Sequence, residues 1–294
     1  MLKKILLPLA AVLSLGCAAA SAQSIKAVDD SKYSISVGDV SMTVDASAGA
    51  KILSFQYKGK EVLSQLQRPN AFGSTFWTSP QVEWNWPPVP EYDTRHFTAE
   101  QRNGALVLTG QESPRFHYRI RKEFRPDPSD NAIVVTYSII NEASVERKVA
   151  PWEISRVPSD GVIFFDATPG TITPIGLLPV TFENEGSWYQ VDEARANRKI
   201  NADGAGWYAY ANDGLLLVKR FPDIDPTQPA PKESEIQVYV NAGKTFIELE
   251  AQGPYTSVKP GQALTWSVRW YLLPQDTDNT PSPALMDLVK SVVK

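Results

Sequence analysis

The densest group of residues suited to chemistry lies between residues 74 and 88, which read STFWTSPQVEWNWPP. Three of the eight tryptophans of the chain, Trp77, Trp84 and Trp86, fall within ten residues there, with polar side chains between them. Sugars have flat apolar C–H faces edged by hydroxyl groups, and tryptophan offers a flat apolar ring with one polar N–H group. The tract therefore predicts a carbohydrate-binding surface. The alternative is a loop whose rings close one end of a buried core.

A pair of carboxylates, Glu248 and Glu250, alternates with Ile247, Leu249 and Ala251. In an extended strand the two glutamates lie on one face and the apolar residues on the other. Carboxylates held side by side repel each other, and such a pair can supply a general base with a raised pKa. The alternative is an exposed polar face.

Two further groups are candidates for binding an acidic ligand. Alternating residues Arg115, His117, Arg119 and Arg121 point to one face of a predicted strand, where they form either a solvated surface or a basic strip. The segment 151–156 contains Trp152, Glu153 and Arg156. In an extended segment Glu153 and Arg156 point to opposite faces, so each reaches a site alone.

The histidines of the chain are only two, His96 and His117, so any histidine-dependent acid–base mechanism must use one of them. The sequence has none of the usual histidine or cysteine spacings of transition-metal sites, no nucleophile elbow and no phosphate-binding glycine loop. We therefore predict no metal and no cofactor. Asp223 and Asp225 give a weak indication of calcium binding.

Strand patterns dominate the rest of the chain and must position these residues. Short apolar or alternating runs bounded by Gly, Pro, Asn or Asp occupy 53–57, 61–63, 105–108, 116–124, 132–140, 162–165, 206–210, 215–219, 236–240, 246–251 and 264–273. One helix is predicted at the end, where Ser282 caps it and Leu285, Leu288, Val289 and Val292 form an apolar stripe. Residues 170–201 and 222–231 read as long surface loops. The pattern predicts an all-β sandwich with fewer than about a tenth of its residues in helices.

The N-terminus has the features of a secretory signal peptide. Lys3 and Lys4 precede an uncharged apolar run at 5–15, and the small residues 20–22 suit signal peptidase. We expect cleavage after Ala22, release into the periplasm, and a single domain at 23–294. Lipid attachment at Cys17 is the alternative. The mature chain would carry 27 Lys and Arg against 33 Asp and Glu, a formal charge of −6, which disfavours nucleic acid and anionic membranes as partners. No later segment is long and apolar enough to span a membrane.

Several of these motifs resemble those of galactose-mutarotase-like (aldose 1-epimerase-like) domains. The runs 49–55 and 59–63 look like the opening of such domains, and 248–250 followed by 258–264 and a last strand through Trp270 look like their end. The tract 74–88 resembles a secreted bacterial branch of that superfamily. The resemblance implies a β-supersandwich whose concave face binds sugar, with Glu248, or alternatively Glu250, as the base. Epimerases have their acid histidine just after a strand that ends in asparagine; residues 141–156 contain none, so His96 or His117 would have to replace it.

These observations leave three hypotheses. The protein is a carbohydrate-active enzyme of epimerase-like or lyase-like chemistry, a non-catalytic carbohydrate-binding module, or a structural envelope protein. A pocket that joins Glu248 to a histidine would favour the first. An open groove with tryptophan but without a convergent acid and base would favour the second. Burial of Trp77, Trp84 and Trp86 would favour the third.

Overall fold

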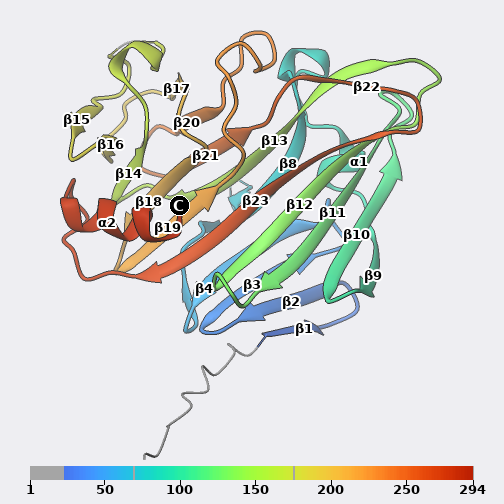
Figure 1. The fold of residues 1–294 in the computed structure, drawn as a ribbon, viewed down its shortest axis with the longest axis horizontal. Helices are drawn as coiled ribbons and strands as arrows, with labels where there is room; N and C mark the ends of the chain where they lie inside the picture. Colours follow the sequence, from blue (N-terminus) through green and yellow to red (C-terminus); the bar gives the residue numbers. More distant parts are fainter. Residues whose placement is uncertain (1–22, 69, 175, 294) are drawn as a thin grey trace, which may run out of the picture.

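The computed structural model describes residues 23–68, 70–174 and 176–293, so the expected signal peptide and Cys17 lie outside the described residues. Strands make up 51% of the structure and helices 7%, which confirms the all-β expectation. The described residues form two large antiparallel sheets packed face to face (Figure 1). A small hairpin of β6 (Gln65–Leu66) and β7 (Ala71–Phe72) lies beside them.

The first sheet carries the residues of interest in its central and later strands. Its order is β1 (Gln23–Ala27), β2 (Lys32–Val37), β3 (Val40–Asp45), β4 (Lys51–Tyr57), β8 (Ser74–Ser79), β13 (Arg147–Pro158), β21 (Phe246–Gln252), β20 (Ile236–Val240) and β17 (Arg198–Ala202), with β5 (Lys60–Glu61) beside β4 and β22 (Thr256–Val258) beside β13. Strands far apart in sequence thus become neighbours, and β8, β13 and β21 lie side by side.

The second sheet covers one face of the first. Its order is β15 (Thr181–Glu183), β16 (Gly186–Gln190), β14 (Val162–Phe165), β18 (Trp207–Asn212), β19 (Leu215–Arg220), β23 (Ala263–Pro274), β12 (Ala132–Asn141), β11 (Tyr118–Asp127), β10 (Ala105–Glu112) and β9 (Thr98–Arg102). Helix α2 (Pro283–Val292) is capped by Ser282, whose hydroxyl accepts the Leu285 N–H at 3.4 Å. Leu285, Met286 and Val289 of α2 are buried in a cluster with side chains of β14, β16, β18 and β19, so the predicted helix packs its apolar stripe on this sheet (Figure 1).

Between the two sheets lies the main apolar core. Phe76 of β8 stacks on Tyr137 of β12 with ring centroids 4.2 Å apart and planes at 4°. On β11, Tyr118, Ile120 and Phe124 point into the core, while Arg119 and Arg121 lie on the outer face. Of the two alternatives predicted for these basic residues, a solvated surface or a basic strip for an acidic ligand, Arg119 and Arg121 therefore form the solvated surface. The strand begins at Tyr118, because His117 has a φ of +54° and lies in the preceding turn.

Two lysines of the second sheet cross the core and bind the first sheet. Lys219 donates to Glu153 and Ser155 of β13, and the ion pair is fully buried. Lys122 donates to the carbonyls of Gly49 and Ala50 at 2.7 and 3.1 Å. Burial lowers the pKa of Lys122 to about 7 and that of Lys219 to about 8, because a charge is costly away from water. These contacts fix how the two sheets lie against each other.

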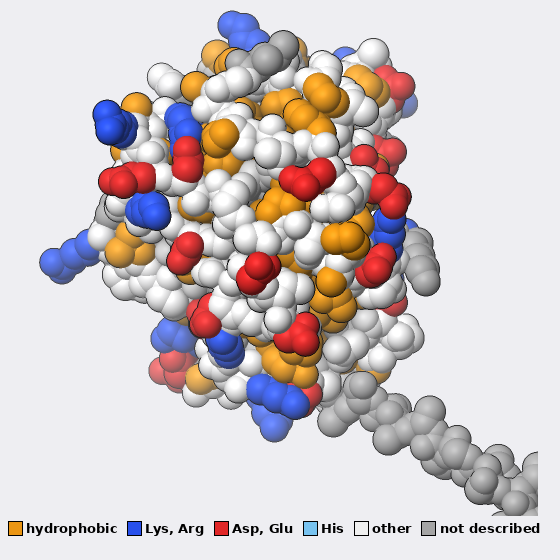
Figure 2. Space-filling view, turned by 90° about the vertical axis from the view of Figure 1, so that its left-hand side faces the viewer, with side chains coloured by type: hydrophobic (Ala, Val, Ile, Leu, Met, Phe, Trp, Pro, Cys, Tyr) orange, Lys and Arg blue, Asp and Glu red, His pale blue; other side chains and the backbone are white. Residues whose placement is uncertain are grey.

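Several segments differ from the sequence-based expectation. The start of the tryptophan tract is a fully buried central strand, β8, and only the part after Ser79 is a loop, with a 3-10 turn at Gln81–Glu83 and the short helix α1 (Pro90–Asp93). Residues 170–201, predicted as a loop, contain β15, β16 and the start of β17, beside a 3-10 turn at Pro169–Thr171. Residues 222–231 have no strand, as expected. Figure 2 shows a face on which acidic and basic side chains are interspersed and apolar side chains form small separate patches.

Candidate functional site

The candidate site is a cavity of about 500 Å³ on the first sheet, within the ~300–1,000 Å³ typical of small-molecule sites. It is lined by aromatic side chains together with three cationic and three acidic ones. The lining residues are Lys51, Asn70, Ala71, Thr75, Trp77, Gln81, Trp86, Pro88, Asp93, Trp152, Arg156, Lys199, Tyr239, Phe246, Glu248 and Glu250.

Strand register explains why these residues meet. Arg156 of β13 lies opposite Glu248 of β21, Glu248 opposite Tyr239 of β20, and Tyr239 opposite Lys199 of β17. Residues directly opposite in antiparallel strands share a face, so these four form a row across the sheet. In the same way Trp77 of β8 lies opposite Trp152. The alternate residues point into the core, which places pocket and core on opposite faces of the same strands.

Four tryptophans form one cluster at the pocket wall. The Trp77 ring contacts those of Trp84, Trp86 and Trp152 in edge-to-face geometry, with centroids 5.6, 6.2 and 5.5 Å apart. The buried indole N–H groups have partners: Trp77 donates to Asp93 at 2.9 Å and Trp84 to the carbonyl of Thr78 at 2.8 Å. The Trp77 and Trp84 rings are therefore held rigidly, and through Trp77 they support the exposed ring of Trp86, so a ligand that stacks on Trp86 orders little further surface.

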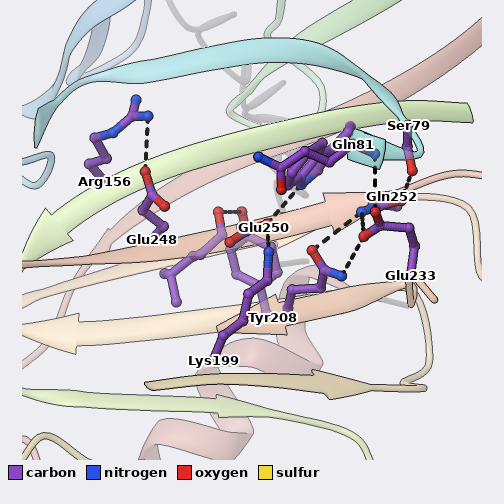
Figure 3. A network of polar contacts seen from close by, with 12 residues as sticks. Ser79, Gln81, Arg156, Lys199, Tyr208, Glu233, Glu248, Glu250 and Gln252 are labelled. Atoms are coloured by element: carbon purple, nitrogen blue, oxygen red, sulfur yellow. Dashed lines mark hydrogen bonds and ion pairs between the residues drawn. The ribbon is translucent and has the colours of Figure 1, made fainter. Parts of the chain in front are cut away.

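The two glutamates of β21 share a face, as predicted, but lie in different surroundings (Figure 3). Glu248 is 18% exposed and forms an ion pair with Arg156 at 2.9 Å. Glu250 is buried and accepts hydrogen bonds from Trp152 Nε1 at 2.8 Å and Lys199 Nζ at 2.9 Å. Burial raises the pKa of Glu250, and the nearby Lys199 opposes that rise. Glu248 is thus the carboxylate that a ligand can reach.

Lys51 is a further titratable group of the pocket and comes from β4. Its side chain is buried. Its Nζ donates a hydrogen bond to Asn70 Oδ1 at 3.2 Å and lies 3.6 Å from the centre of the Phe72 ring. Burial, with a smaller effect of the Arg156 charge, lowers the pKa of Lys51 to about 8. An amine with such a pKa can give or take a proton near neutral pH.

A hydrogen-bonded network joins the loop after β8 to the sheet beneath it (Figure 3). Ser79 donates to Gln252 Oε1 at 2.6 Å, and Gln252 donates to Glu233 at 3.0 Å. Glu233 also accepts the backbone N–H of Gln81 at 3.2 Å and the side-chain amide of Gln237 at 2.9 Å. The network holds this rim of the pocket in place without using the groups that face the cavity.

The other residues predicted for the site lie outside the pocket. Glu153 is buried in the core with Lys219, because it occupies the alternate position to Trp152 and Arg156. Trp84 is buried behind Trp77. His117 pairs with Glu112 at 2.8 Å, and Arg119 pairs with Glu142 at 2.7 Å on the outer face of the second sheet. His96 is exposed beyond α1. Both histidines are described, and neither lines the pocket.

Sequence reasoning missed Lys51, Lys199, Asp93 and Tyr239. Lys51 of β4 and Lys199 of β17 are remote in sequence from both the tryptophan tract and β21, whereas Asp93 ends α1 soon after the tract and Tyr239 lies on β20, directly before β21. The sequence predicts a strand at 236–240, but alternation alone does not show which face of the sheet Tyr239 occupies. Lys199 falls within the predicted loop 170–201 and so has no predicted face. The pairing of β17 with β20 places both side chains.

Within residues 23–68, 70–174 and 176–293, no group of three or more acidic or histidine side chains is arranged to hold a metal ion. Over the same part of the chain, no helix has the length and apolar character needed to cross a bilayer.

The chain has the galactose-mutarotase-like fold, as its similarity to solved structures shows. A candidate aldose 1-epimerase from Escherichia coli K12 aligns over 86% of this chain and 100% of its own, with a TM-score of 0.59 and 14% identity. A galactose mutarotase-like protein from Clostridium acetobutylicum aligns over 87% of this chain and 99% of its own, with a TM-score of 0.55 and 9% identity. One from Lactobacillus casei covers 86% of this chain and 100% of its own, with a TM-score of 0.52 and 13% identity. No family model matches the sequence, and no curated protein is significantly similar to it.

The separation of pocket from core predicts different effects of two glutamate substitutions. Glu153→Gln leaves Lys219 buried without a counter-charge and should lower the free energy of unfolding by about 3 to 5 kcal/mol. Glu248→Gln is its comparison: Glu248 is 18% exposed and the amide still accepts from Arg156 beside the cavity, so the loss should be clearly smaller than that of Glu153→Gln. Urea unfolding of both variants measures this. Equal losses would contradict the assignment of Glu248 to the pocket rather than to the core.

Proposed function

We propose that this protein binds carbohydrate in the cavity on the first sheet. The observation that carries the proposal is the meeting of rigid aromatic rings and charged hydrogen-bonding groups in one cavity of suitable volume. The galactose-mutarotase-like fold supports it, since several solved structures with this fold are described as epimerase or mutarotase proteins. The mixture of charges suits hydroxyl groups, which both donate and accept hydrogen bonds.

The lining residues provide for both surfaces of a sugar ring. Trp86 and Tyr239 offer aromatic faces on which its apolar C–H face can pack. Glu248 accepts hydrogen bonds from hydroxyl groups, while Lys199 and Arg156 donate to them. Because Arg156 and Lys199 are already engaged by Glu248 and Glu250, the polar groups are oriented before the ligand arrives.

Tyr239→Ala should weaken sugar binding about three- to tenfold, because it removes one aromatic face from the cavity. Phe182→Ala is the matched control: Phe182 is an exposed aromatic residue of β15 that lies outside the cavity, and its loss should leave affinity unchanged. Calorimetric titration with glucose, galactose, glucuronate and galacturonate and with their oligomers measures the affinities. Equal effects of the two variants would show that the sugar does not bind in this cavity. Failure of the wild type to bind any of these sugars would refute carbohydrate binding as the function.

Export to the periplasm is part of the same proposal and rests on the sequence of residues 1–22. We expect the mature protein to begin at Gln23. Mass spectrometry of the protein recovered from a periplasmic fraction measures the mature N-terminus. A diacylated N-terminus at Cys17 would replace the free periplasmic form by a membrane-anchored one.

Interconversion of sugar anomers is a second candidate function, favoured by the presence of Glu248 and of Lys51, with its lowered pKa, in one cavity. Glu248 would take the proton from the anomeric hydroxyl while the Lys51 ammonium gives one to the ring oxygen. The C1–O5 bond then breaks and C1 becomes an aldehyde. Rotation about C1–C2 and reversal of both proton transfers would give the other anomer, with the two side chains restored.

On this second hypothesis, Glu248→Gln should lower the catalysed rate by about 10² to 10⁴-fold, since a general base contributes that much. Lys51→Met should also lower it. The wild-type rate should fall as the pH rises above about 8, because Lys51 then loses its proton. Polarimetry of freshly dissolved α-glucose and α-galactose measures the rate. A wild-type rate equal to that of buffer alone would leave carbohydrate binding as the function without catalysis.

A further inference from the structure

Trp86 stands out among the tryptophans because it is 68% exposed, whereas the other seven are at most 7% exposed. Its ring is nevertheless held in place, since its centroid lies 6.2 Å from that of Trp77 at an interplanar angle of 81°. Pro87 and Pro88 follow it directly and restrict the backbone. A large apolar ring that is held in place and yet open to water contributes little burial to folding, and it offers rigid apolar surface that a ligand can cover.

Trp86 also separates two hollows. With Pro88 it lines both the main cavity and a second hollow of about 190 Å³. The second hollow is bordered by Glu91 at the start of α1 and by Ser113, Arg115 and Phe116 in the turn between β10 and β11. The two hollows therefore share a wall, and that wall presents an indole ring.

The second hollow is too small to be an independent ligand site, because such sites usually enclose ~300–1,000 Å³. It does have the composition of an extension of one. Phe116 and Pro88 give it apolar surface, while Glu91 and the exposed Arg115 give it an acceptor and donors. The Arg115 guanidinium lies 4.7 Å from the centre of the Phe116 ring, which keeps it at this edge.

We infer that the ligand is an oligosaccharide of two or more sugar units, with one unit in the main cavity and the next against the second hollow, so that the chain passes over Trp86. This inference rests on the proposed function and names its substrate class. An oligosaccharide suits the arrangement because its units are rigid rings joined at short intervals, each with an apolar face and a hydroxyl edge. A single sugar in the main cavity would leave the second hollow, and the side of the Trp86 ring that borders it, unused.

Titration of the full mature chain with sugars of increasing length tests the inference. The ligands are glucose and galactose, and the di-, tri- and tetrasaccharides of the cello-, malto- and galacto- series. The wild type should bind the best trisaccharide at least about tenfold more tightly than the corresponding monosaccharide, an advantage of about 1.4 kcal/mol. Arg115→Ala, which alters only the second hollow, should reduce this length advantage about threefold or more and leave monosaccharide affinity unchanged.

Trp86→Ala should abolish most of the length advantage, and Trp86→Phe should retain part of it. Val82→Ala is the matched control, because Val82 is 76% exposed in the same loop and lines neither hollow. Equal affinity for mono- and trisaccharides, or loss of the advantage in Val82→Ala as much as in Trp86→Ala, would overturn the inference while the proposed function stands. Failure to bind any sugar would refute the proposed function and this inference with it.

Discussion

The buried ion pair between Glu153 and Lys219 is the constraint on which the arrangement of the site depends. It joins β13 of the first sheet to β19 of the second across an apolar core, where neither charge can be left alone without a large cost. Since side chains of a strand alternate, holding Glu153 toward the second sheet turns Trp152 and Arg156 toward the cavity. A shift of β13 by one residue would put Arg156 into the core and expose Glu153. The ion pair therefore sets the register of the strand as well as linking the sheets.

The other buried charges near the cavity are paired as well. Glu250 is buried but bound by Lys199 and by the Trp152 indole, and Arg156 is bound by Glu248. Arg156 and Trp152 come from β13 beside β21, and Lys199 comes from β17, beyond β20, so the pairs that neutralise charge also tie β13, β21 and β17 together. The rim loop is attached separately, through Glu233. The side chains that face the cavity are thus oriented by contacts that a ligand has no need to break.

Periodic features of the sequence predicted the structure well, and non-periodic ones did not. Alternation at 246–251 predicted the opposite faces of Glu248 and Leu249, and the cap and apolar stripe of the last helix predicted α2. The loop after β8 has no period, so nothing in it distinguished buried Trp84 from exposed Trp86, two residues away. Lys199 and Glu250 lie 51 residues apart, and their contact depends on the order of strands in the sheet. The placement of Glu153 followed from alternation once Trp152 was known to face the cavity.

The assignment of cavity and core to opposite faces of the same strands has a consequence for how such proteins diverge. Substitutions at positions such as Lys199, Tyr239 and Glu248 alter the lining of the cavity, while the alternate positions that hold the two sheets together stay as they are. Selection on ligand preference and selection on folding therefore act on nearly separate sets of residues. The lining of the cavity can therefore change without loss of the fold, and the same fold is found in solved structures that are only 9 to 14% identical to this chain.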